Sequence, residues 1–130
     1  MTPAKFLTMT VGIPLLAGVA LMLLLRGCSG PPVITVVNHS GSKIHNLVLE
    51  GEGFSVVLPD MAPGSSVTTI VHPSGESSLY VSLQLEDRVV TKDDLTYIEP
   101  GGGYMTIVRV HSAGQIECRS DVGFSWRRAL

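Results

Sequence analysis

Metal chemistry is the first reactivity that the residue types of this chain suggest. The candidate ligands are His39, His45, His72, His111, Met61 and Met105. Imidazole and thioether groups suit copper, and imidazole also suits zinc. However, no two histidines fall at an i, i+2 or helical spacing, which ligand sets on one element usually show. Metal binding is therefore the alternative interpretation, behind a role that needs no cofactor.

A serine and a lysine could in principle form a catalytic pair. Ser40-Gly41-Ser42-Lys43 matches the S-x-x-K motif, in which a serine nucleophile opens a helix and the lysine lies one turn later as its base. Here turn residues surround the motif, and the overlapping Asn38-His39-Ser40 is a glycosylation sequon that matters only in a eukaryotic host. No other base–nucleophile pair stands in a convincing context, so we expect no enzyme.

Acidic residues dominate the middle of the chain, with ten Asp or Glu against four Lys or Arg between Val33 and Cys118. Such a body repels phosphate backbones, which argues against a nucleic-acid partner. Glu86-Asp87 and Asp93-Asp94 lack the regular alternation of oxygen ligands in a calcium loop. We expect them to be solvated charges in turns.

A run without charge extends from Phe6 to Leu25. At about 20 residues it is long enough to cross a bilayer as a helix, and membrane helices tolerate a proline such as Pro14. The run predicts membrane contact through residues 6–25. In the version that we favour it is an uncleaved single-pass anchor, with Lys5 and the amino terminus in the cytoplasm.

The end of this run offers a second interpretation. Leu25-Arg26-Gly27-Cys28 is similar to a bacterial lipobox, in which a leucine and a small residue precede a lipidated cysteine. Cys28 is therefore a lipidation candidate, and residues 1–28 are an anchor or a lipoprotein signal segment. Arg26 departs from the pattern, and the run exceeds the roughly 7–15 apolar residues of a signal core. Both interpretations put the rest of the chain on the same side of the membrane.

The two cysteines allow a disulfide. In an oxidising compartment Cys28 and Cys118 could pair and tie the anchor to the last strand. If Cys28 is lipidated, that pairing is impossible and Cys118 is a lone thiol. A buried Cys118 that acts as a small apolar residue is the third possibility.

Short apolar segments follow a Pro-rich spacer at residues 29–32. The clearest alternation is at Ser78–Leu85, where every second residue is apolar, which is typical of a strand with one wet face. Turn residues separate the expected strands at 33–37, 44–49, 54–58, 67–71, 78–85, 88–91, 97–99, 104–110 and 115–118. Residues 33–118 therefore predict a single small antiparallel β-sandwich, immunoglobulin-like or related.

Residues 119–130 form a basic and aromatic tail. Its candidates for docking to a partner or to lipid headgroups are Phe124, Trp126, Arg127 and Arg128. A frayed terminus without a role is the alternative.

Several turn motifs carry a resemblance. They are Gly27-Cys28, Asn38-His39-Ser40-Gly41, Pro63-Gly64-Ser65-Ser66, Gly75-Glu76-Ser77 and Gly101-Gly102-Gly103-Tyr104. With the apolar run, they resemble small, uncharacterised bacterial envelope proteins that join a membrane or lipid anchor to a β-sandwich. The resemblance implies a domain in the periplasm or outside the cell, tethered to the membrane, and it implies no catalytic residue.

The predicted function is a non-enzymatic interaction or accessory module with a protein partner. Its working surfaces would be an exposed sheet edge and the tail. Copper or zinc binding in the envelope is the alternative.

Overall fold

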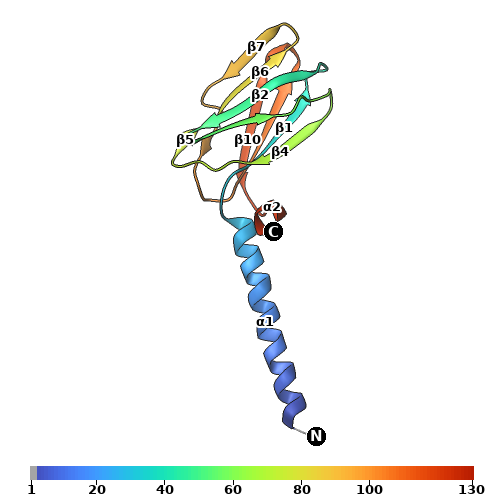
Figure 1. Ribbon diagram of the computed structural model, residues 1–130, viewed down its shortest axis with the longest axis vertical. Helices are drawn as coiled ribbons and strands as arrows, with labels where there is room; N and C mark the ends of the chain where they lie inside the picture. Colours follow the sequence, from blue (N-terminus) through green and yellow to red (C-terminus); the bar gives the residue numbers. More distant parts are fainter. Residues whose placement is uncertain (1–2) are drawn as a thin grey trace.

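Two four-stranded sheets form the body of the protein, and a long helix projects from one end of it (Figure 1). The structure is a computed structural model that describes the backbone of residues 3–130 and the side chains of residues 12–130. The C-terminus lies beside the end of the helix that is nearest the body (Figure 1). The chain is therefore mainly β, with a sandwich-like arrangement after one N-terminal helix.

The helix α1 spans Pro3–Cys28 and includes Pro14. Its described apolar side chains are mostly exposed, among them Leu15, Leu16 and Leu25. The side chains of Phe6–Val11, the first part of the apolar run, lie outside the described residues.

Across residues 12–130, no helix combines the length and the apolar character that crossing a membrane requires. The predicted spanning helix is accordingly not confirmed.

The first sheet, sheet A, has the strand order β10-β9-β1-β4. Its strands are β1 (Val33–His39), β4 (Ser66–Ile70), β9 (Tyr104–His111) and β10 (Ile116–Val122). The pairing of β1 with β9 is parallel, so the prediction of a wholly antiparallel sandwich is wrong at this pair. A tight hairpin forces neighbouring strands to run antiparallel, but β1 and β9 are far apart in sequence and carry no such constraint.

The second sheet, sheet B, has the order β3-β2-β6-β7. Its strands are β2 (Ile44–Gly51), β3 (Phe54–Leu58), β6 (Tyr80–Leu85) and β7 (Arg88–Lys92). A two-stranded ribbon pairs β5 (Ser77–Ser78) with β8 (Tyr97–Ile98). Two short helical elements, η1 (Ser112–Gly114) and α2 (Trp126–Ala129), complete the chain.

The core fills the space between the two sheets. The predicted alternation is confirmed in β6, where Val81, Leu83 and Leu85 are buried and the residues between them are half-buried. Ile34, Val36 and Val108 come from the facing sheet, so both inner faces contribute to one cluster. The sandwich leaves four edge strands, β3, β4, β7 and β10.

Candidate functional site

The four edge strands differ in charge. The β9–β10 turn lies against β7, since a Cβ on Gly114 would contact Val90, so β7 and β10 share one side of the sandwich. That side carries Arg88 and Lys92 on β7 and three further charges on β10. On the opposite side β3 reads Phe-Ser-Val-Val-Leu and β4 reads Ser-Val-Thr-Thr-Ile, with no charge in either strand. Charged side chains on an edge discourage pairing with other chains, and uncharged edges permit it.

Register decides which backbone groups of β3 remain free. Gly51 pairs with Phe54 across a two-residue turn, so Phe54 and every second residue after it bond to β2. Ser55 and Val57 lie between those bonds and turn their N–H and C=O groups outward. The side chain of Val57 is 72% exposed. The free edge of β3 thus combines unpaired backbone groups with an exposed apolar side chain.

Sheet B ends in a matching hairpin on its other side. Leu85 pairs with Arg88 across a two-residue turn, so Val89 and Thr91 occupy the outward positions on β7. The side chain of Val89 is 69% exposed. Val57 and Val89 therefore both occupy outward positions and are similarly exposed, and the strands around them differ in charge.

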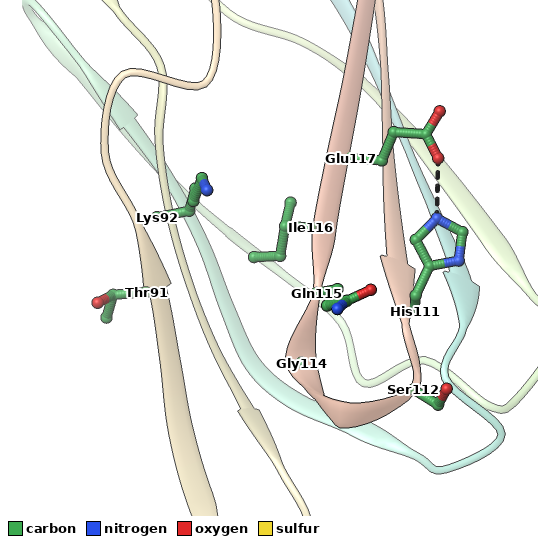
Figure 2. A pocket seen from close by; sticks show the side chains of 8 residues that line it. All are labelled: Thr91, Lys92, His111, Ser112, Gly114, Gln115, Ile116 and Glu117. Atoms are coloured by element: carbon green, nitrogen blue, oxygen red, sulfur yellow. Dashed lines mark hydrogen bonds and ion pairs between the residues drawn. The ribbon is translucent and has the colours of Figure 1, made fainter.

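A hollow of about 840 Å³ lies between β7 and the β9–β10 hairpin. Figure 2 shows Thr91 and Lys92 on one wall, with His111, Gln115, Ile116 and Glu117 on the other. His111 Nε2 lies 2.9 Å from Glu117 Oε2, and this hydrogen bond is the main cause that lowers the pKa of the Glu117 carboxyl. The hydrogen-bond partner of His111 is thus the Glu117 carboxylate, which orients the imidazole ring and is not a hydroxyl or thiol nucleophile.

The histidines do not converge on a metal site. The rings of His39 and His111 lie at a tilt of 60° with centroids 5.9 Å apart, whereas His45 Nδ1 bonds Asp60 Oδ2 at 2.9 Å in another part of the molecule. Met61 is buried in the core. Within the described part of the chain, no three His, Cys, Asp or Glu residues are grouped closely enough to hold a metal ion. The copper or zinc alternative stays a prediction.

The serine–lysine motif and the sequon belong to one structural loop. Asn38 is fully buried, and its amide donates to the carbonyls of Ser42, Met61 and Ala62 at 2.8–3.2 Å. Ser40 Oγ donates to Asn38 Oδ1 at 2.6 Å. Asn38 therefore fixes the connection between β3 and β4, and its amide is not presented for modification.

The tail docks onto α1 of its own chain. Phe124 packs against the buried Gly27, where a Cβ would overlap its ring, and the Ser125 N–H donates to the Gly27 carbonyl at 2.8 Å. The strand β10 continues to Val122, so the tail proper begins later than residue 119. Trp126 stacks edge-on against Phe124 with centroids 4.9 Å apart and remains 62% exposed. Docking of the tail to a partner stays a prediction.

Arg128 is the least satisfied polar side chain of this junction. Its Nη2 donates to the Gly123 carbonyl. Among residues 12–130, its Nε and Nη1 are the buried side-chain polar atoms that find no hydrogen-bond partner. Burial lowers the pKa of the Arg128 guanidinium. Arg127 is exposed beside it.

Both cysteines are free thiols, so the proposed disulfide is not present. Gly103 lies against the carbonyl of Cys28, while Cys118 pairs with Val108, five residues further along β9. At about 3.3 Å per residue this separation is roughly 16 Å, and a disulfide needs Cα atoms within about 7 Å. Burial raises the pKa of the Cys118 thiol, and the side chain packs against the core. Lipidation of Cys28 stays a prediction.

Comparison with known proteins supports the fold alone. No family model matches the sequence, and no curated protein matches it. The chain is similar to a protein from Eubacterium rectale with a structure solved by NMR, at 9% identity and a TM-score of 0.51, over 72% of this chain and 91% of that one. It is also distantly similar to a "putative cell adhesion protein" from Bacteroides ovatus, at 9% identity and a TM-score of 0.41, over 75% of this chain and 45% of that one. Both similar structures are bacterial.

Proposed function

We propose that this protein is a non-enzymatic interaction module of the bacterial cell envelope that binds an extended segment of a partner protein along β3. The single observation that carries the proposal is the free edge of β3, an uncharged strand with Val57 exposed. An incoming strand would bond the outward backbone groups of Ser55 and Val57 and extend sheet B by one strand.

Charge at the ends of β3 defines the partner's chemistry. Glu52 precedes the strand, and Ser55 Oγ donates to Glu50 Oε1 at 3.4 Å. Asp60 follows the strand, where Lys43 and His45 already contact its carboxylate. An extended segment with small or β-branched residues in its centre and a basic residue at the end that meets Glu50 and Glu52 would complement this edge. An acidic segment would meet like charges, which oppose binding.

Helix α1 is the proposed tether. Its exposed described side chains between Ile13 and Leu25 are apolar, and the residues of the run that precedes them carry no charge. Such a surface is stable in lipid rather than in water. We propose that α1 inserts into the membrane, with or without a lipid on Cys28, and holds the sandwich on the outer side.

Photo-crosslinking in the host's own membranes tests the proposal. A photoreactive residue replaces Val57 in one full-length variant and Val89 in a second, matched variant. We expect a discrete adduct with one protein from position 57, at a segment of extended sequence with a basic end, and little adduct from position 89. Equal adducts from both positions, or adducts at scattered segments, would contradict binding along β3.

A further inference from the structure

A basic pocket lies where α1 meets the sandwich. It has a volume of about 370 Å³ and receives Arg26 and Ser29 from the helix end, His72 from the loop after β4, and Arg127 and Arg128 from the tail. None of the eight described residues that line it is acidic. The acidic body is thus interrupted at this junction by a concentration of positive charge.

Arg128, which lines the pocket, has unused hydrogen-bond donors. Arg128 passes between Gly30 and Gly103, and its Nη2 is held by the Gly123 carbonyl. Its buried Nε and Nη1 have no acceptor among the described residues. A buried, unpaired donor on a charged group costs free energy, which an acceptor bound in the pocket would recover. Arginine presents its donors in a planar fork that fits the oxygens of a phosphate.

The position of the pocket identifies the source of such an acceptor. Arg26 is on the last turn of the apolar helix, next to Leu25, so it is one residue from the side chains that we propose to lie in lipid. The headgroup region begins where the apolar residues end, and its phosphates lie at that depth. Inorganic phosphate offers the same oxygens without the requirement for a membrane.

We propose that the pocket binds the phosphate of an anionic phospholipid headgroup through Arg26 and Arg128, with Arg127 and His72 at its margin. This inference is independent of strand binding at β3 and relies on the proposed insertion of α1 for the source of the phosphate. The bound headgroup would fix the orientation of the sandwich on the membrane, because its ligands come from both the helix and the tail.

Tryptophan fluorescence provides the measurement, since Trp126 is the single tryptophan and adjoins Arg127. Full-length protein in a neutral detergent is titrated with short-chain phosphatidylglycerol, with short-chain phosphatidylcholine, and with inorganic phosphate. We expect a saturable change with phosphatidylglycerol and at least about tenfold weaker binding in the Arg26→Gln, Arg128→Gln double variant, because charge-assisted hydrogen bonds are lost.

Two controls keep the test decisive. Arg119→Gln removes a charge on β10 that is paired with Asp121 at 3.3 Å outside the pocket, and it should leave binding unchanged. Arg26→Gln with His72→Gln changes exposed residues and should weaken binding even if Arg128→Gln perturbs folding. Equal weakening by Arg119→Gln, equal binding of phosphatidylcholine, or no saturation would overturn the site. Inorganic phosphate binding as tightly as phosphatidylglycerol would overturn the lipid assignment.

Discussion

The two edges of sheet B resemble each other in geometry and differ in chemistry. Each is the outer strand of a hairpin with a two-residue turn, and each presents one valine at an outward position, Val57 on β3 and Val89 on β7. On β7, Arg88 and Lys92 flank that valine within the strand, whereas β3 has no charge. The comparison teaches that exposure of an apolar residue does not define a binding edge by itself, because charges beside it can block strand pairing.

Loss of the Asn38 side chain should have the largest effect, because it loosens the connection behind the uncharged edge. Asn38→Ala removes a buried amide together with its hydrogen bonds to the carbonyls of Met61 and Ala62, and we expect a loss of about 3 kcal/mol in the free energy of unfolding. Chemical denaturation measures this loss. Gln84→Ala, which removes an exposed hydrogen bond with Asn46 in sheet B, should cost below about 0.5 kcal/mol. A similar cost for both variants would contradict the role of Asn38.

Proline tests the free N–H groups of the two edges. Val57→Pro removes an outward donor and should weaken binding of the crosslinked segment, supplied as a synthetic peptide, by at least about tenfold. Val89→Pro introduces a proline at an outward position of β7 and should leave the affinity unchanged. Isothermal titration calorimetry measures both affinities. If the two prolines weaken binding equally, the effect comes from general strain in sheet B.

Exchange of charge between the edges should produce a smaller effect. Val57→Lys keeps the backbone donor but places a charge on β3, so we expect the peptide to bind several-fold more weakly than to the unaltered chain. The converse variant, Arg88→Thr with Lys92→Thr, makes β7 uncharged and should promote self-association. Analytical ultracentrifugation in detergent measures the association. A β7 variant that stays monomeric at all concentrations would show that charge does not protect this edge.

The smallest expected effect is a change in the pKa of Glu117, on the side of the sandwich formed by β7 and β10. The hydrogen bond with His111 holds the pKa of Glu117 below its usual range. The associated stabilisation is present above the unfolded pKa of Glu117 and is lost as the pH falls through its lower folded pKa. His111→Ala should raise the Glu117 pKa toward its usual range, as measured by carboxyl chemical shifts. An unchanged titration would show that the bond is not formed in solution.

Local patterns predict the strands well. The alternation around Val81 and Leu83 and the turn residues between segments place most strands within a few residues of their observed ends, because they reflect burial of one face. The absence of charged residues in β3 can also be read from the sequence. Its position at an edge is not, because strand order depends on pairings between distant segments such as β1 and β9.

The junction could not be predicted from the sequence. A glycine at position 27 fits the lipobox pattern. The structure shows a second requirement for glycine there, because the Phe124 ring approaches too closely to leave room for a Cβ atom. The tail is more than 90 residues away along the chain, and no local pattern connects it to the helix. For the same reason Arg26 and Arg128, two of the arginines of the basic pocket, belong to segments that no local sequence pattern connects.

Amide hydrogen exchange on the full-length protein, with and without the partner peptide, tests the central claim most directly. In the free protein the Ser55 and Val57 amides should exchange rapidly, because they face away from β2, and so should those of Val89 and Thr91. The account predicts that the peptide protects Ser55 and Val57 and leaves Val89 and Thr91 unchanged. Protection of β7 instead, or of neither strand, would contradict it.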